Sequence, residues 1–206
     1  MNEPSTQPFL DLVRCQRGCR EYIAEPVPLD DVLTILDAAV RAPSAHNSQP
    51  WEFVVVTDPD VRGAISSLAR ASWEAGRAVT AAKLEHGLLG AVDSYIGDND
   101  YGGAPVLVVL GVDTNKVNPV VAGSSIYPAA QNLMLAALSL GYATNLTNFT
   151  LRMNDELARL LDIPAHIQLF GIVSLGRSVR PLGPSRREPA SEHCHVNRFG
   201  NRVTGS

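Results

Sequence analysis

The chain is organised around Arg41-Ala42-Pro43-Ser44-Ala45-His46-Asn47-Ser48-Gln49-Pro50-Trp51, which joins a predicted amphipathic helix to a predicted apolar strand. Its two prolines fix their own φ angles and disfavour helical backbone at Ala42 and Gln49. Five polar residues lie between the prolines on a stiff loop, an arrangement that suits a planar ligand with polar edges. An ordinary capped connection is an equal alternative, because serine and asparagine both hydrogen-bond locally.

Regular elements are predicted on both sides of this segment. A helix over Leu29–Val40 precedes it, with apolar residues at helical spacing and two aspartates in the first turn. A strand over Trp51–Thr57 follows it and leads through Asp58-Pro59 into a helix that ends near Ala71. The pattern therefore predicts a helix–loop–strand unit whose loop is available to a ligand.

The rest of the chain predicts more helices and two buried strands. Helices are expected at 7–14, around 77–89, at 124–140 and at 154–161, and strands at 104–112 and 167–175. The helix at 124–140 is apolar nearly all round, which places it in the middle of the fold. Gly141 suits the end of that helix, and a loop is expected over 142–149. The predicted class is α+β, with a central mixed sheet sandwiched by helices.

Length and composition predict a single domain. The chain has 206 residues, of which 45% are hydrophobic and 18% charged, so one well-packed domain over residues 1–206 is expected. Residues 179–206 carry too little apolar surface to fold alone. We expect them to form an extended tail that wraps a partner subunit, with Phe199 and Val203 as docking residues. An obligate homodimer follows from that expectation.

Charge and residue usage argue against several classes of protein. The formal net charge of -4 disfavours a nucleic-acid binder, and the longest apolar tract, Ile126–Leu140, is too interrupted to predict a membrane span. The start of the chain lacks the pattern of a signal peptide, and an odd number of cysteines argues against a disulfide framework, so a cytoplasmic location is expected. No metal site is expected at His193-Cys194-His195, because adjacent side chains rarely converge on one ion.

Motifs of the common nucleotide-binding and hydrolytic folds are missing from the sequence. There is no Gly-x-Gly-x-x-Gly after a strand, no P-loop, no His-Glu-x-x-His and no Gly-x-Ser-x-Gly. Two arginine clusters stand out instead: Arg14, Arg17 and Arg20, and then Arg177, Arg180, Arg186 and Arg187. Because arginine is the preferred planar partner of phosphate, the clusters could enclose one phosphate between the chain ends. For any single arginine, a solvated surface position is the commoner explanation.

Four segments resemble the nitroreductase family of FMN-dependent NAD(P)H oxidoreductases. They are Gln16–Tyr22, Pro43–Trp51, Ala130–Gly141 and Ser185–Pro189, and the ending Val196–Gly200 also resembles the family's terminal motif. In this family the first and fourth segments hold the FMN phosphate. The second packs along the flavin, often from the neighbouring subunit, and the loop after the third approaches flavin N5. Gln16 stands where the family usually has arginine, and Gly18 where it usually has serine.

The resemblance implies an FMN site in which flavin N5 is the reactive centre and no side chain is catalytic. The cofactor-binding residues that it implies are Gln16, Arg17, Gly18, Arg20, Pro43, Ser44, Ala45, Asn47, Gln49, Thr147, Asn148, Arg186 and Arg187. Arg20 would stabilise negative charge near flavin N1. His46 is expected to be a hydrogen-bonded structural group, since loop histidines more often have that role than one in acid catalysis.

The implied reaction passes two electrons from NADH or NADPH through FMN to a nitroaromatic, a quinone or a similar electron-poor small molecule by a ping-pong mechanism. The FMN would lie at the interface of a homodimer. Two alternatives on the same scaffold stay open. One is a flavin-dependent dehydrogenase or oxidase of a specific small metabolite, and the other is a non-catalytic flavin-binding sensor.

Overall fold

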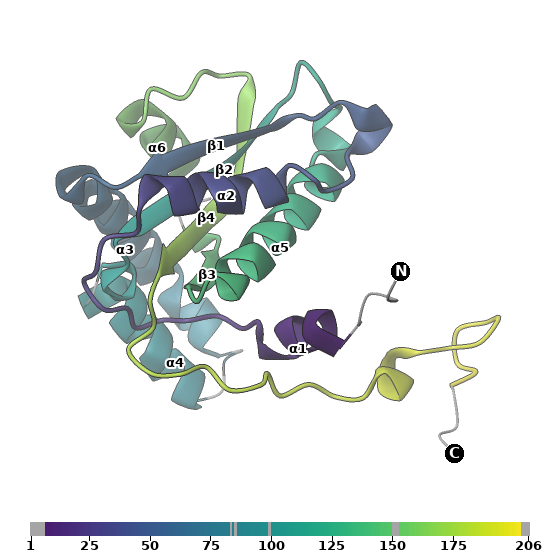
Figure 1. Cartoon of the computed structure of the whole chain (residues 1–206). Helices are drawn as coiled ribbons and strands as arrows, with labels where there is room; N and C mark the ends of the chain where they lie inside the picture. The colour runs from purple at the N-terminus through teal and green to yellow at the C-terminus, as the bar shows by residue number, and fades with distance from the viewer. Residues whose placement is uncertain (1–6, 83, 85, 99, 150–152, 203–206) are drawn as a thin grey trace.

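The computed structural model describes residues 7–202 except 83, 85, 99 and 150–152, and these residues form a four-stranded sheet (Figure 1). The strands are β1 (Trp51–Val56), β2 (Val106–Asp113), β3 (Ala143–Thr147) and β4 (Ile167–Gly176), in the order β1-β2-β4-β3. All neighbouring pairs are antiparallel, so the α+β class is confirmed, but the described strands do not form the mixed sheet that we expected. β2 and β3 run in the same direction and are joined through α5, but β4 lies between them and is antiparallel to both, so no neighbouring described strands are parallel.

Helices cover both faces of the sheet. They are α1 (Gln7–Cys15), α2 (Leu29–Ala39), α3 (Pro59–Ala81), α4 (His86–Val92), α5 (Gly123–Ser139) and α6 (Asn154–Leu160). Short turns are η1 (Ala45–Asn47), η3 (Tyr101–Gly103), η4 (Pro119–Val121) and η6 (Ala190–His193), and η2 (Asp93–Asp98) is a π-helix. One core lies between the sheet and helices α2 and α5, and a second lies between the sheet and α3, η2 and α6. β2 contributes to both cores, as its apolar sequence predicted.

The first half of the chain departs from the sequence prediction in the length of α3. This helix begins where the Asp58 side chain accepts hydrogen bonds from two N–H groups of the first turn, with Pro59 at the first helical position. It continues to Ala81, well past the expected end near Ala71, because Trp73 and Gly76 extend its buried face. The helix expected around 77–89 is therefore divided between α3 and α4, and residues 83 and 85 lie outside the described residues. No helix in the described ranges is long and apolar enough to cross a bilayer.

The segment expected to be a loop after Gly141 is an edge strand. β3 pairs with β4 from Ala143 opposite Gly176 to Thr147 opposite Ile172. Apart from Leu146 its side chains are small or polar, yet Thr144, Asn145 and Thr147 are each less than 9% exposed. Buried polar residues hide the alternation by which a strand is usually recognised, which explains why the sequence suggested a loop.

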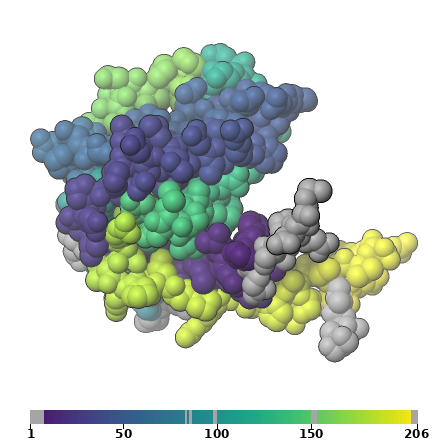
Figure 2. All heavy atoms as spheres, viewed as in Figure 1, coloured from purple at the N-terminus to yellow at the C-terminus, as the bar shows by residue number. Residues whose placement is uncertain are grey.

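The N-terminal segment and the C-terminal tail run alongside each other. Val179 N–H donates to Glu21 O at 3.2 Å, and Ser185 N–H donates to Arg14 O at 2.8 Å. Beyond this point the tail leaves the body and extends past α1 (Figures 1 and 2). Phe199 near its end is 93% exposed. The described part of the tail leaves the Phe199 ring, which lies 4.3 Å from the His195 ring, almost fully exposed.

Candidate functional site

The base of the candidate site is the segment Gly18–Tyr22, which backbone hydrogen bonds hold on two sides. Cys19 N–H donates to Thr144 O on the free edge of β3 at 2.8 Å, and Tyr22 N–H donates to Gly102 O at 2.9 Å. Gly102 has φ +69°, and a Cβ there would collide with the backbone carbonyl of residue 20. Three elements distant in sequence therefore meet in a fixed arrangement.

Ion pairs divide the seven arginines of the two sequence clusters into two groups. Arg14 pairs with Asp11, Arg177 with Glu25 and Arg180 with Glu21. Among the described residues, no carboxylate lies within 4.0 Å of Arg17, Arg20, Arg186 or Arg187. Because these four guanidinium groups keep their donors uncompensated by a described carboxylate, they are the ones suited to an external anion.

Three of these four arginines surround one hollow, which we call the basic crevice. It has a volume of about 300 Å³ and is lined by Arg17, Ser185, Arg186 and Arg187. The bond between Ser185 and Arg14 places the tail there. A second hollow of about 300 Å³ adjoins it at Arg17 and runs past the half-buried Arg20 to residues 178–183 of the tail. The structure thus brings together the arginines from opposite ends of the chain that the sequence singled out.

Two more predicted residues lie at the base beside the crevice. The Gln16 side chain is half-buried, and its Nε2 lies 3.5 Å from Met134 Sδ on α5. Gly18 pairs with Thr144 and is exposed, and a Cβ at this position would collide with Asn145 Oδ1. The carboxamide of Asn145 therefore occupies the space that a side chain at position 18 would need, so glycine here has a steric cause.

The free edge of β3 continues from the base towards the other predicted residues. Because Thr144 O accepts from Cys19, the backbone of Thr144 faces outward, and hydrogen-bond directions alternate along an antiparallel strand. Leu146 consequently presents its N–H to the free edge, whereas the carbonyl of Thr147 points at Gly171 on β4. Asn148 follows at the end of the strand, with its Nδ2 3.5 Å from the Tyr127 hydroxyl.

The remaining predicted residues belong to the proline loop, residues 43–51. Within it, Gln49 N–H donates to Ser44 Oγ at 3.1 Å, and the Gln49 side chain lies 3.4 Å from Asn47 Oδ1. His46, Asn47 and Gln49 have φ of +54°, +52° and +47°, and all three side chains are exposed. Non-glycine residues in this region cost of order 1–3 kcal/mol each, so the loop is held in a strained shape that displays polar groups.

The proline loop and the basic crevice lie at opposite parts of α5 in one chain. Ala45 N–H donates to Ser125 Oγ near the start of the helix, whereas Gln16 contacts Met134 further along. At 1.5 Å of rise per residue, these two attachment points are about 13 Å apart along the helix axis. Pro43, Ser44, Ala45, Asn47 and Gln49 are therefore separated from the arginines of the same chain.

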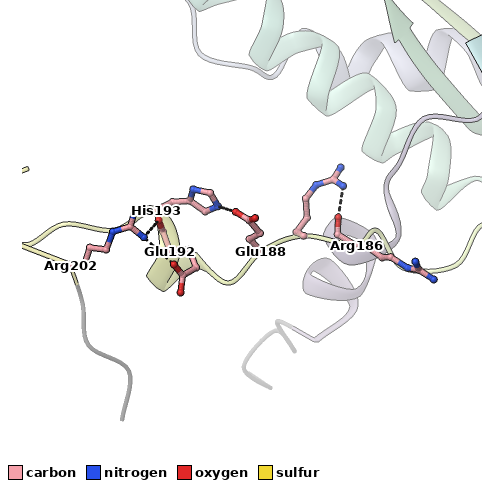
Figure 3. Close-up of polar contacts among 6 residues, drawn as sticks. Arg186, Glu188, Glu192, His193 and Arg202 are labelled. Carbon is pink, nitrogen blue, oxygen red and sulfur yellow. Dashed lines mark hydrogen bonds and ion pairs between the residues drawn. The ribbon is translucent and has the colours of Figure 1, made fainter. Parts of the chain in front are cut away.

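Side chains at the base and in the tail do not form a nucleophile or a metal site of the usual kind. Burial raises the pKa of the Cys19 thiol, which donates to Glu21 O at 3.2 Å. In the tail, His193 contacts Glu188 at 3.2 Å (Figure 3). Within the described ranges, no three histidine, cysteine or acidic side chains gather as a metal site would require.

Sequence reasoning missed the buried polar residues beneath the base. Tyr22 and Tyr95 both contact the Ser174 hydroxyl, each at 2.8 Å, and Ser174 Oγ also lies 3.4 Å from Asn145 O on β3. The four residues come from the N-terminal segment, η2, β3 and β4. The only signal for them in the sequence was that Tyr22 and Asn145 fall inside segments already assigned to the ligand.

Comparison with known proteins identifies the family of the chain. A model of the nitroreductase family matches residues 13–177. The 4-nitrobenzoate reductase of Nocardioides sp. is 26% identical over an alignment of 224 positions, which covers 92% of this chain and 90% of that relative. Iodotyrosine deiodinase 1 of Rattus norvegicus is 28% identical over 182 residues, which cover 83% of this chain and 62% of the deiodinase, so the chain spans about three fifths of that relative's length.

A solved structure supports the fold independently. The crystal structure of oxidised iodotyrosine deiodinase bound to FMN and 3-iodo-L-tyrosine superposes with a TM-score of 0.74 at 22% identity, covering 92% of this chain and 99% of the other. The fold and the site define an α+β protein with an arginine-lined crevice beside the edge strand β3. Because the family model matches well over half of its length, the chain belongs to the nitroreductase family.

Proposed function

We propose that this protein binds FMN and passes two electrons from NADH or NADPH to an electron-poor acceptor, such as a nitroaromatic or a quinone, by a ping-pong mechanism. The observation that carries the proposal is the basic crevice, where Arg17 meets Arg186 and Arg187 without a described carboxylate partner. A phosphate monoester carries a charge of about -1.5 to -2 near pH 7 and accepts several charge-assisted hydrogen bonds. The donors in the crevice fit that group.

The residues along the crevice and the strand edge have separate roles in this proposal. Arg17, Arg186 and Arg187 bind the phosphate, with Gln16 and Gly18 beside it. Arg20 places a positive charge over the adjoining hollow, where it would stabilise negative charge on a bound ring. The N–H groups of Leu146 and Asn148, next to Thr147, offer donors at the far end. FMN, when bound, would supply the hydride-accepting centre, and the chain positions it and tunes its charge.

The proline loop completes the site from a second copy of the chain. It is about 13 Å along α5 from the base on its own chain, and its polar side chains face outward. In a homodimer, Pro43, Ser44, Ala45, Asn47 and Gln49 of one subunit would pack along the ring held by the other. The exposed Phe199 supports the same arrangement, because a tail that ends in an aromatic side chain gains stability by docking on a partner.

The decisive experiment is an anaerobic titration of the purified protein. A yellow protein that bleaches with NADH or NADPH, and recovers its colour with a nitroarene or a quinone, agrees with the proposal. A yellow protein that is inert to both nicotinamides would indicate a flavin-binding sensor, or an oxidase with its own reductant. A colourless protein that cannot be reconstituted with FMN would exclude all three. Sedimentation of the FMN-loaded protein as a folded monomer at micromolar concentration would exclude the shared site.

A second candidate is reductive removal of a halogen from an aromatic metabolite. It is favoured by the 28% identity to iodotyrosine deiodinase 1 over 83% of this chain. The same titration distinguishes the two, because 3-iodo-L-tyrosine then becomes a further acceptor for the bleached protein. Release of iodide at a rate above that of nitroarene reduction would favour dehalogenation.

A further inference from the structure

The base of the site is closed from beneath by a ring of buried hydrogen bonds. Ser174 Oγ donates to Asn145 O on β3 at 3.4 Å and lies 2.8 Å from the Tyr95 hydroxyl, which joins the ring from η2. Ser174 Oγ lies 2.8 Å from the Tyr22 hydroxyl, which donates to the Cys19 carbonyl at 3.0 Å. Cys19 N–H then donates to Thr144 O, and Thr144 is covalently joined to Asn145, so the ring closes.

The hydroxyls of the ring have several acceptors. Tyr22 donates to the Cys19 carbonyl, and Ser174 Oγ donates to Asn145 O. Between Tyr22 and Ser174, and between Tyr95 and Ser174, either hydroxyl can be the donor. Burial raises the pKa of Tyr95 to about 12 and that of Tyr22 well above its ordinary value, so both phenols stay protonated donors.

The members of the ring are too well buried for water to replace a lost partner easily. Ser174 is 0% exposed, Tyr95 1%, Tyr22 6% and Asn145 7%. Removing one group from such a ring leaves another buried polar atom unsatisfied, which costs more than the net value of the bond. The ring is therefore a stiff connection between η2 and the base.

We propose that Tyr22, Tyr95, Asn145 and Ser174 are positioning residues that hold Gly18–Cys19 against β3 and thereby place Arg17 and Arg20 for the flavin. This inference rests on the proposed function, because the quantity that it sets is the affinity and the potential of the bound FMN. It also explains the glycine at position 18. The Asn145 carboxamide fills the space that a side chain at position 18 would need.

The first test is hydrogen exchange in the protein without cofactor, which does not depend on the proposed function. In Ser174→Ala and in Tyr95→Phe, the Cys19 amide should exchange roughly tenfold faster or more, because its attachment to β3 loosens. Ser66→Ala is the matched control, since Ser66 is 1% exposed and its hydroxyl has no hydrogen-bond partner among the described residues. Equal exchange in Ser174→Ala and Ser66→Ala would overturn the ring.

The second test measures FMN directly. Ser174→Ala and Tyr95→Phe should weaken FMN binding by roughly tenfold and shift its midpoint potential, while Ser66→Ala leaves both unchanged. Faster exchange with unchanged affinity and potential would overturn the positioning role. If the unaltered protein binds no FMN, the proposed function fails instead, and the exchange experiment still decides whether the ring fixes the base.

A double-mutant cycle tests the contact between Gly18 and Asn145. Gly18→Ala alone should weaken FMN binding by roughly tenfold or more, because the new methyl group collides with the Asn145 carboxamide and forces the base away from β3. In an Asn145→Ala background the same substitution should have less than about a threefold effect, because the space is then empty. Equal effects in both backgrounds would contradict the proposed coupling.

Discussion

The two parts of α5 differ in how the surface around them is completed. Near Met134, the N-terminal segment and the tail of the same chain close the basic crevice. Near Ser125, the proline loop displays His46, Asn47 and Gln49 to solvent from a strained backbone. A surface closed by its own chain can bind an anion in the monomer, whereas a rigid, exposed loop acquires a role only against a second molecule. We therefore expect phosphate affinity and dimer formation to be separable by mutation.

The largest effect is expected from the crevice. Arg186→Gln combined with Arg187→Gln should weaken FMN binding by roughly 100-fold or more, because two charge-assisted contacts to the phosphate are lost. Flavin fluorescence during titration of the protein without cofactor measures this. The melting temperature of that protein should change little, because both side chains are exposed. Arg159→Gln on the surface of α6 is the control, and an equal loss there would mean that the effect is general electrostatics.

A smaller effect, on assembly, is expected from the tail. Phe199→Asp should weaken the dimer by roughly 10-fold to 100-fold, because it places a charge where an aromatic side chain would dock. Sedimentation over a dilution series gives the dissociation constant. Val79→Asp is the matched control, since Val79 is also exposed but lies on α3, in the main body of the chain. An unchanged dimer in Phe199→Asp would place the tail outside the interface.

Within the proline loop, two serine substitutions test whether the hydrogen bond from Gln49 N–H to Ser44 Oγ stabilises the loop. Ser44→Ala should lower the free energy of unfolding by about 1 kcal/mol, because the Gln49 N–H then loses its acceptor. Ser48→Ala should change it by less than about 0.5 kcal/mol, because Ser48 Oγ has no partner among the described residues. Urea denaturation of the two variants compares them. Equal losses would show that the bond to Ser44 does not hold the loop.

The smallest effect is a local response to acid on the far face of the sheet. The hydrogen bond from Arg77 lowers the pKa of Asp93, which also accepts from Trp73 Nε1 at 2.8 Å. Because the folded pKa lies below the unfolded one, the stabilisation is complete above about pH 4 and is lost as the pH falls through the folded value. Trp73 fluorescence in a Trp51→Phe background should change below pH 3.8, and Asp93→Asn should remove that transition. A transition that persists in Asp93→Asn would assign it to another group.

The comparison between the two parts of α5 also shows which parts of the site were readable in the sequence. The proline loop was predicted because its prolines and polar residues are contiguous, and its attachment to Ser125 required the structure. Both arginine clusters were visible, but only the tertiary contacts distinguish Arg17 and Arg20 from Arg180, which pairs with Glu21 at 2.7 Å. Ion pairing depends on distance in space, which local sequence does not specify.

The sequence by itself determined the α+β class and the helices that surround the sheet, and it predicted the candidate ligand segments, because hydrophobic periodicity and local motifs act over a few neighbouring residues. The tertiary structure alone decided that β3 is a strand, that every described strand pair is antiparallel and that the proline loop is remote from the crevice of its own chain. It also decided the buried ring, whose bonds join Tyr95 and Tyr22 to Ser174 across 79 and 152 residues. Such long-range hydrogen bonds form only after the chain has folded, so no local pattern records them.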